Sequence, residues 1–512
     1  MKVILTGEDL TLDQLVAVAR EHAEVELSPE TVEKVKRSRA IVDDIVENER
    51  VVYGITTGFG SLHNVHISKE DTVQLQENLI RTHAAGAGEP LKEDEVRAVM
   101  TIRVNSLVKG VSGVRPLMIE TLINMLNKNV LPFIPQQGSL GASGDLAPIS
   151  HMVLPMLGLG RAYYEGELLP GREAMEKAGI PCIQLDAKEG LALNNGTSVL
   201  TAIGALATYD AMQLLKLSDI AGALSLEAHR GIIDAFYEKL HTIRPHVGAL
   251  ATARNIRNLT EGSTYLTHTA ELRTQDAYTL RCMPQIHGAS KDTISYVAEK
   301  VAIELNAATD NPIITVDGDV ISGGNFHGEP MAQPFDFLGI GAAEIGNVSE
   351  RRIERLVNHQ LSDFPSFLVK NPGLNSGFMI TQYSAASLVS ENKVLAHPAS
   401  VDSIPSCENQ EDFVSMGTLA ARKARDIVKN SLRCVATEIL AAVQAIDFRK
   451  EMTDGKLGVG TQAAYDAVRE KLNFIADDSE IEMYDELEKI TNLLVDGSLL
   501  KAVEEKVQID LQ

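Results

Sequence analysis

Residues 416–448 form the longest uninterrupted helical pattern in this 512-residue chain. The segment contains no proline and no glycine after Gly417, and its apolar residues recur at helical spacing. This pattern predicts a helix of roughly thirty residues, far longer than the usual 10 to 14. Similar runs occupy residues 337–357, 380–395 and 484–507. Because long helices bury their apolar faces by packing side by side, we expect a mainly α fold with a core of long antiparallel helices.

The character of the sequence changes near residue 200. Before it, short helical patterns are broken by glycine-rich turns at residues 54–61 (GITTGFGS) and 138–145 (GSLGASGD). After it, long apolar segments at helical spacing dominate. We therefore expect a smaller mixed N-terminal region over residues 1–200 and a long-helix bundle over residues 201–512. No repeat and no Pro/Ser-rich linker marks the boundary, which is approximate.

The composition argues against nucleic acid or a membrane as a partner. Asp and Glu number 70 against 47 Lys and Arg, which gives a net charge of −23, whereas nucleic-acid backbones and anionic lipids favour basic surfaces. The most apolar long stretch, residues 200–236, is interrupted by charged residues and is predicted to be a buried helix rather than a membrane span. Asp210, Lys216, Asp219 and Glu227 are among them.

Cysteine and histidine spacing gives no sign of a metal site. The four cysteines are far apart and form no CxxC pair, and the thirteen histidines include no HExxH. No GxGxxG, P-loop or GxSxG pattern supports a nucleotide site or a hydrolase serine. The N-terminus, MKVILTGEDLTLDQL, lacks the long apolar segment of a signal peptide. We expect a cytoplasmic protein without a metal or a nucleotide cofactor.

The tripeptide Ala142-Ser143-Gly144 can perform unusual backbone chemistry. It lies at the centre of residues 134–148, IPQQGSLGASGDLAP. The amide nitrogen of Gly144, which has no neighbouring Cβ, can attack the carbonyl carbon of Ala142. Loss of water there, and loss of the Ser143 hydroxyl as a second water, leaves a methylidene-imidazolone ring, a strong electrophile. A bare Ala-Ser-Gly is more often an ordinary turn, so this interpretation depends on the surrounding sequence.

Six segments of the chain resemble the histidine branch of the aromatic amino acid ammonia-lyase family. They occur in the order YGITTGFG, GSLGASGDLAP, LALNNGT, QDAYTLRC, GGNFHGEP and NQEDFVSMG, and the resemblance extends from about residue 2 to at least residue 450. It implies an ammonia-lyase/fumarase-like helical fold and a self-formed 4-methylidene-imidazole-5-one cofactor. The implied reaction is elimination of ammonia from L-histidine to give trans-urocanate, the first step of histidine degradation.

The resemblance also implies which residues build the cofactor and remove a proton. Ala142, Ser143 and Gly144 match the cyclising tripeptide, and Asp145 matches its acidic neighbour. Tyr53 matches the base that takes the β-proton of the substrate. Because an unperturbed phenol has a pKa of about 10, its surroundings would have to favour the phenolate.

Five further residues match substrate-binding or catalytic positions. Arg281 matches the guanidinium that grips the substrate carboxylate, a task that suits its paired planar donors. Tyr278 matches a catalytic tyrosine and would share a helical face with Arg281. Gln275 and Asn195 match polar positions that contact the substrate or the ring, and Phe326 matches an aromatic wall of the pocket.

Two positions indicate the substrate. His83, after Thr82, stands where histidine lyases have Ser-His, tyrosine lyases His-Leu and phenylalanine lyases Phe-Leu. Glu411, expected to be both catalytic and substrate-binding, falls where the histidine branch has glutamate, and its carboxylate can accept an imidazole N–H. Two positions depart from the pattern: Phe413 replaces a common histidine, and Arg81 replaces an apolar residue.

Other functions remain open at this point. The alternatives are a tyrosine or phenylalanine ammonia-lyase, an aromatic 2,3-aminomutase, and a non-catalytic helical scaffold that keeps the fold. Addition of the substrate amine to the electrophile is favoured over addition of its imidazole ring, and both fit the residues. The family is homotetrameric with active sites shared between subunits, so a homotetramer acting on a small amino acid is implied.

Overall fold

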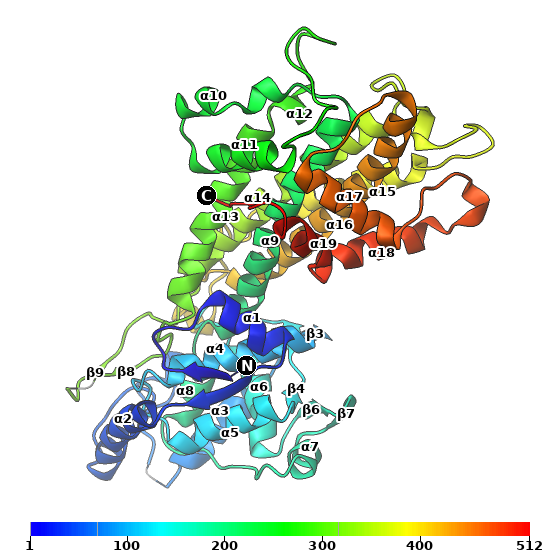
Figure 1. Cartoon of the computed structure of the whole chain (residues 1–512). Helices are drawn as coiled ribbons and strands as arrows, with labels where there is room; N and C mark the ends of the chain where they lie inside the picture. The colour runs from blue at the N-terminus through cyan, green and yellow to red at the C-terminus, as the bar shows by residue number, and fades with distance from the viewer. Residues whose placement is uncertain (1, 69, 316) are drawn as a thin grey trace. The chain divides into compact units, whose positions relative to one another are not determined.

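The computed structural model describes residues 2–68, 70–315 and 317–512. Over this part of the chain there are nineteen α-helices and nine short strands, which confirms the predicted mainly α fold (Figure 1). The longest helix is α16 (Gly417–Met452), which coincides with the segment predicted from the absence of helix breakers. The next longest are α9 (Ser198–Ala228), α14 (Glu329–Val357) and α13 (Met283–Glu304).

Of two shorter helices predicted from the sequence, one forms a single helix and the other is divided in two. The run predicted at residues 380–395 forms α15 (Met379–Leu395) as one helix. The run at residues 484–507 is divided into α18 (Met483–Val495) and α19 (Ser498–Glu504). The break lies at Gly497, which has a φ of +75°, a left-handed conformation that ends a helix and that glycine adopts without steric cost.

The contacts divide the chain into two compact units. The first comprises Met1–Ala207, Ala298–Asp336 and Pro398–Arg422, and the second comprises Thr208–Val297, Phe337–His397 and Lys423–Gln512. The first unit thus takes in two segments from beyond residue 200. The boundary near residue 200 between a mixed region and a helix bundle stays a prediction.

The first unit holds all of the described strands together with the helices that precede residue 198. The strands form four small sheets, in which β1 pairs in parallel with β2, and the pairs β3–β5, β4–β6–β7 and β8–β9 are antiparallel. These elements have the following bounds: β1 (Lys2–Leu5), α1 (Leu12–Arg20), β2 (Glu24–Leu27), α2 (Pro29–Glu47), α3 (Thr72–His83), β3 (Ala87–Pro90), α4 (Glu93–Leu107), α5 (Pro116–Asn127), β4 (Leu131–Pro132), β5 (Pro135–Gln137), α6 (Leu146–Val153), β6 (Arg161–Tyr164), β7 (Glu167–Pro170), α7 (Gly171–Lys177), α8 (Glu189–Asn194), β8 (Ile313–Ile314) and β9 (Val320–Ile321).

The second unit is helical throughout its described elements. Besides α15, α18 and α19 it contains α10 (Glu238–Thr242), α11 (Val247–Leu259), α12 (Tyr278–Arg281) and α17 (Val459–Lys471). Its core uses small residues where long helices meet. A Cβ added to Gly222 of α9 would lie 2.3 Å from the Met283 sulfur at the start of α13. A side chain at that position would therefore require the flexible end of Met283 to move.

The charged residues on α9 do not oppose its burial. α9 is the one described helix long and apolar enough to cross a membrane, yet 78% of its most apolar stretch is buried inside the protein. Within the second unit the Asp219 carboxylate accepts hydrogen bonds from His287 Nδ1 at 2.8 Å and from Lys291 Nζ at 2.5 Å. The charge is thus paired in the core, as expected for a buried helix.

Glu227, near the end of α9, makes the unfolding free energy of the protein depend on pH. Its side chain is buried and accepts the Gly458 N–H at 2.8 Å, and burial raises its pKa from 4.5 to about 7. The stability from this raised pKa is complete below pH 4.5 and is lost as the pH rises through about 7. Glu227→Gln keeps the acceptor and removes the ionisation. We expect its unfolding free energy to equal that of the wild type near pH 4 and to exceed it by on the order of 2–3 kcal/mol near pH 8.

Thermal midpoints measured across this pH range test the prediction. Glu261→Gln, which alters an exposed carboxylate, is the control and should show no such trend. A difference between Glu227→Gln and wild type that stays constant with pH would contradict the buried ionisation.

Candidate active site

A cavity in the first unit gathers residues from widely separated parts of the sequence. Its volume is about 450 Å³, and its lining combines apolar and polar groups. Six of the residues predicted from sequence line it. They are Tyr53, Ala142, Ser143, Asn195, Phe326 and Glu411. Gly144 and Asp145 follow Ser143 directly in the same loop and are not among the described lining residues.

The Ala-Ser-Gly segment is held by a backbone pairing with Gly196. The Gly196 N–H donates to the Ser143 carbonyl at 3.2 Å, and the Asp145 N–H donates to the Gly196 carbonyl at 2.7 Å. Gly144, between these two bonds, has a φ of +76°, and a Cβ added to it would lie 2.0 Å from the Gly196 oxygen. Only glycine fits at this position without displacing the backbone at Gly196.

Asp145 is the buried anchor of this loop. Its Oδ2 accepts the N–H groups of Val199 and Leu200 at 2.9 and 2.8 Å, in the first turn of α9. Its Oδ1 accepts from the hydroxyls of Thr418 at 2.5 Å and Ser139 at 2.9 Å. Burial raises the pKa of the Asp145 carboxyl, and these hydrogen bonds act in the opposite direction.

Three helices begin beside the loop. Asp145 precedes α6 and caps the first turn of α9, and Thr418 belongs to the first turn of α16. Just before α16, the Met416 N–H donates to the Leu140 carbonyl at 2.9 Å, and the Ser415 hydroxyl donates to the Gly141 carbonyl at 3.0 Å. Because the N-terminus of a helix carries partial positive charge, this arrangement favours negative charge developing in the loop.

Glu411 faces the Ala-Ser-Gly segment from another loop. The Ser143 hydroxyl donates to Glu411 Oε1 at 2.9 Å, and the Ser406 hydroxyl donates to Oε2 at 2.9 Å. Between Ser406 and Glu411, three successive residues, Cys407, Glu408 and Asn409, have φ values of +50°, +55° and +67°. Left-handed backbone is unfavourable for Cys407 and Glu408, so this loop is strained and persists because its ends are paired.

Tyr53 lies in the cavity, and its surroundings favour the protonated form of its phenol. The Gly60 N–H donates to its hydroxyl oxygen at 3.3 Å. Burial is the main cause that raises the pKa of Tyr53, the Glu411 carboxylate adds to the rise, and the Gly60 hydrogen bond opposes it. The surroundings within the first unit therefore do not favour the phenolate that a general base would require.

His83 ends α3 and is half-buried. Burial lowers the pKa of its imidazole, while the nearby Glu411 charge acts to raise it. The Thr82 hydroxyl lies 3.2 Å from His83 Nδ1. His83 is not among the described residues that line the cavity.

Gln275, Tyr278 and Arg281 belong to the second unit, whereas every described residue lining the cavity belongs to the first. Tyr278 and Arg281 form the two ends of α12, and the Arg281 guanidinium lies 4.7 Å from the centre of the Tyr278 ring. The shared helical face predicted for this pair is confirmed. Tyr278 is 69% exposed, and Arg281 Nε is buried without a hydrogen-bond partner among the described residues.

The cavity also contains residues that the motifs did not single out. His327 Nδ1 accepts the Glu329 N–H at 3.2 Å, so its Nε2 carries the proton and donates to the Phe413 carbonyl at 3.2 Å. The His327 and Phe413 rings are stacked with centroids 6.2 Å apart. His327 adjoins Phe326 in the segment GGNFHGEP, which is the signal that would have indicated it. Asn311, also in the lining, has no comparable motif around it.

No metal-binding cluster is found in residues 2–68, 70–315 and 317–512. No three His, Cys, Asp or Glu side chains are gathered there in a way that would hold an ion. The four cysteines are free thiols. The side chains that line the cavity supply carboxylate, phenol, amide, hydroxyl and imidazole groups.

The chain belongs to the aromatic amino acid lyase family, whose sequence model matches residues 10–470. A histidine ammonia-lyase from Streptococcus pyogenes serotype M49 (strain NZ131) is 69% identical over 508 residues, which cover 99% of both chains. A histidine ammonia-lyase from Streptococcus gordonii is 68% identical over the same length and coverage.

Solved structures show the same fold. The histidine ammonia-lyase from Trypanosoma cruzi superposes with a TM-score of 0.93 at 42% identity, and the match covers 100% of this chain and 96% of that one. A tyrosine aminomutase from Streptomyces globisporus gives a TM-score of 0.95 at 38% identity and covers all of both chains. The predicted ammonia-lyase fold is confirmed by these likenesses.

The pairing of Gly144 with Gly196 can be tested at Gly196. This residue has a φ of +128°, and an added Cβ would lie 2.4 Å from Thr309 Oγ1 and 2.7 Å from the Thr309 carbonyl oxygen. Gly262→Ala is a matched control, because Gly262 has a φ of +79° with nothing within 4 Å of an added Cβ. We expect Gly262→Ala to cost about 1–2 kcal/mol of unfolding free energy from its backbone conformation. Gly196→Ala should cost a further ~1–3 kcal/mol from the forced backbone shift.

Chemical or thermal unfolding of the two variants measures this difference. Equal losses of stability would show that the close approach to Thr309 does not constrain the pairing.

Proposed function

We propose that this protein eliminates ammonia from L-histidine to give trans-urocanate, the first step of histidine degradation. The observation that carries the proposal is the cavity in which Ser143 of an Ala-Ser-Gly segment donates to Glu411 at 2.9 Å. The relatives at 68–69% identity over nearly the whole chain are histidine ammonia-lyases, which supports histidine as the substrate.

We infer that Ala142, Ser143 and Gly144 form the methylidene-imidazolone group that members of this family use. The residues fit this chemistry. Gly144 has no side chain to obstruct its nitrogen, and no hydrogen bond from its N–H occurs among the described residues. A bond from the Gly144 nitrogen to the Ala142 carbonyl carbon, with loss of that oxygen and of the Ser143 hydroxyl as two waters, closes the ring.

The methylidene-imidazolone ring would be held by donors that are already in place in the structure. The Gly196 N–H faces the Ser143 carbonyl, the oxygen that remains on the ring. This donor and the N-termini of α6, α9 and α16 would stabilise negative charge on that oxygen. When formed, the group supplies an electrophilic methylidene carbon that activates the amino group of the substrate for departure as ammonia.

Recognition of the imidazole is assigned to Glu411 and His83. The Glu411 carboxylate can accept an imidazole N–H and favour the imidazolium form. Its charge also couples to His83, the residue at the end of α3. Phe326 provides an apolar wall, and the buried Asn195 Oδ1, which lacks a partner among the described residues, can accept a hydrogen bond from the substrate.

Tyr53 is proposed to take the β-proton on its phenol oxygen. For that step its pKa must fall, since the first unit by itself raises it. A cationic group placed near the phenol would favour the phenolate. Arg281, which lies in the second unit beside Tyr278, is the proposed source of positive charge and of the grip on the substrate carboxylate.

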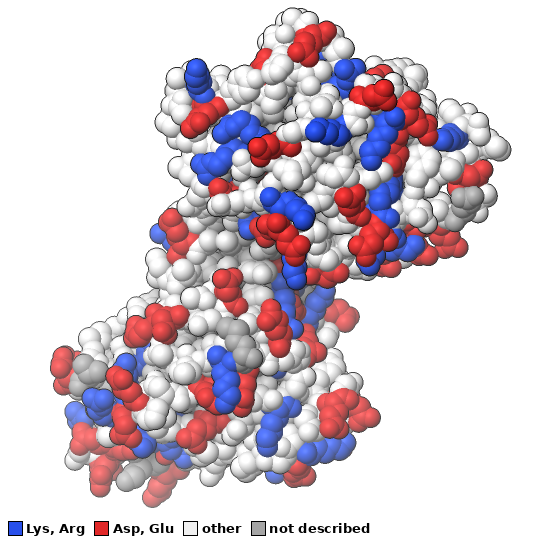
Figure 2. Space-filling model, viewed as in Figure 1, with Lys and Arg blue, Asp and Glu red and all other residues white. Residues whose placement is uncertain are grey.

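We propose a cytoplasmic homotetramer in which Gln275, Tyr278 and Arg281 of neighbouring subunits complete each site. Apolar side chains at the loop that carries Glu411 are exposed in the single chain, including Val401 at 75% and Phe413 at 59%. Such exposure is costly in water and is removed when a second chain covers it. Figure 2 shows basic and acidic residues interspersed over the visible face, which supports a small-molecule substrate rather than nucleic acid or a membrane.

Absorbance at the urocanate band, recorded with L-histidine, L-tyrosine and L-phenylalanine in separate incubations, tests the reaction. We expect product from histidine alone, and none from Ser143→Ala. Intact mass should show that the wild type has lost two waters relative to its sequence and that Ser143→Ala has not.

Other results would redirect the assignment. A β-amino acid product would identify an aminomutase, and product from tyrosine or phenylalanine would overturn the roles of His83 and Glu411. No product and no loss of water would leave a helical scaffold that keeps only the fold.

Shared active sites are tested by mixing inactive chains. Ser143→Ala and Arg281→Ala should each lose nearly all activity when expressed alone. If Ser143 and Arg281 of one site come from different subunits, co-expression should restore activity to a measurable fraction of sites. Light scattering should give a tetramer, and an active monomer at assay concentration would refute the shared site.

A further inference from the structure

The short helix α8 supports two walls of the cavity. All six of its residues are buried, and Asn195 and Gly196 follow directly at its end. Leu191, in its middle, packs against the Tyr53 loop, because a Cβ added to Gly54 would lie 2.4 Å from Leu191 Cδ2. A displacement of α8 would therefore move Asn195, the Gly196 pairing and the Tyr53 loop together.

A helix of six residues has too few internal hydrogen bonds to hold its own place. The start of α8 is instead fixed by other elements. Gln76 of α3 accepts the N–H groups of Gly190 and Leu191 on its Oε1, at 2.8 and 3.2 Å. At the other end, Arg103 of α4 donates to the Asn195 carbonyl at 2.5 Å.

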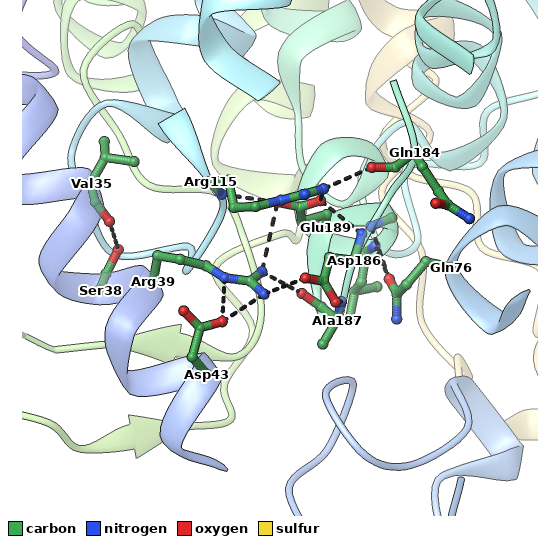
Figure 3. A network of polar contacts seen from close by, with 12 residues as sticks. Val35, Ser38, Arg39, Asp43, Gln76, Arg115, Gln184, Asp186, Ala187 and Glu189 are labelled. Carbon is green, nitrogen blue, oxygen red and sulfur yellow. Dashed lines mark hydrogen bonds and ion pairs between the residues drawn. The ribbon is translucent and has the colours of Figure 1, made fainter. Parts of the chain in front are cut away.

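Glu189, the first residue of α8, carries most of this anchoring. Its side chain is fully buried, and Figure 3 shows it at the centre of a polar network. Oε1 accepts from the backbone N–H and the Nε of Arg115 at 2.9 and 2.8 Å. Oε2 accepts from Arg115 Nη2 at 2.6 Å and from the Asp186 N–H at 2.8 Å.

A second arginine joins the network from α2. Arg39 Nη1 lies 3.6 Å from Glu189 Oε1, and its guanidinium also donates to Asp186 Oδ2 at 2.9 Å and to the Ala187 carbonyl at 3.0 Å (Figure 3). The Glu189 carboxylate is the largest cause that raises the pKa of Arg115. An ionised carboxylate thus accepts from every donor that surrounds it, which a neutral amide cannot do.

We propose that Glu189 is a positioning residue for the reaction: through α8 it sets Asn195 and the Gly196 pairing against the Ala142-Ser143-Gly144 segment. The expected effect of Glu189 on catalysis rests on the proposed function. The expected effect of Glu189 on ring closure does not, because the Gly196 pairing constrains the Gly144 backbone whatever the substrate is. Small displacements of such groups cost far more in rate than in stability.

Glu189→Gln tests the proposal, because the amide keeps the shape and places an N–H₂ group against surrounding donors. We expect the fraction of chains that have lost two waters to fall by about twofold or more, and kcat per ring-containing chain to fall about tenfold or more. KM should rise less than kcat falls. Intact mass and histidine kinetics on the purified full-length protein give these values.

Asp447→Asn is the matched control. Asp447 lies in the second unit, where it accepts from Arg469 Nε at 3.0 Å and from the Tyr465 hydroxyl at 2.5 Å. The change removes a carboxylate, here a partly buried one, from its arginine partner, as Glu189→Gln does. We expect a lowered thermal midpoint with the ring fraction and kcat per ring unchanged.

Arg39→Lys covers the case in which Glu189→Gln does not fold. It keeps the charge and removes the paired donors to Asp186 and Ala187, so it should give the same changes at smaller size. A folded Glu189→Gln with wild-type ring fraction and kcat would overturn the proposal, as would a loss that Asp447→Asn shares. A wild type that forms the ring yet makes no urocanate would refute the proposed function alone, since the ring fraction still reports on Glu189.

Discussion

The pairing between the backbones of Gly144 and Gly196 is the constraint on which the candidate site depends. It joins two loops that are far apart in sequence, and it leaves no room for a side chain at Gly144. Asp145 continues from the pairing into the first turns of α9 and α16. The first turns of these two helices are therefore tied to the cavity, and they support the loop that carries Ser143.

Electrostatics in the first unit prepare only part of the proposed chemistry. Helix N-termini and the Gly196 N–H stand ready for negative charge at the Ser143 carbonyl. The Tyr53 phenol is held in its protonated form by burial and by Glu411. The proposed ring is thus stabilised by its surroundings, whereas the proposed base, Tyr53, is not ionised by them. A further positive charge near Tyr53 is needed, and this is the physical reason for proposing that Arg281 of another chain joins the site.

Much of this could be predicted from the sequence because it is local. Absence of helix breakers located α16, and six motif blocks located most of the cavity lining. The division of the run at residues 484–507 was missed, although Gly497 was visible in the sequence as a candidate helix end. The network around Glu189 could not be predicted, because Arg39, Gln76 and Arg115 lie 74 or more residues away and carry no motif. The raised pKa of Tyr53 depends on burial, which a motif does not encode.

The loop that carries Glu411 is attached differently from the loop that carries Ser143. Residues 141–145 are bound to helices through buried backbone contacts, whereas the left-handed turn at Cys407–Asn409 hangs between two paired ends and exposes Phe413. Under the proposed function, the segment that forms the ring and one of the segments that bind the imidazole are therefore held in place separately. Side chains of the Glu411 loop can then be exchanged without loosening the backbone that supports the ring, which gives descendants of such a chain one route to a different substrate.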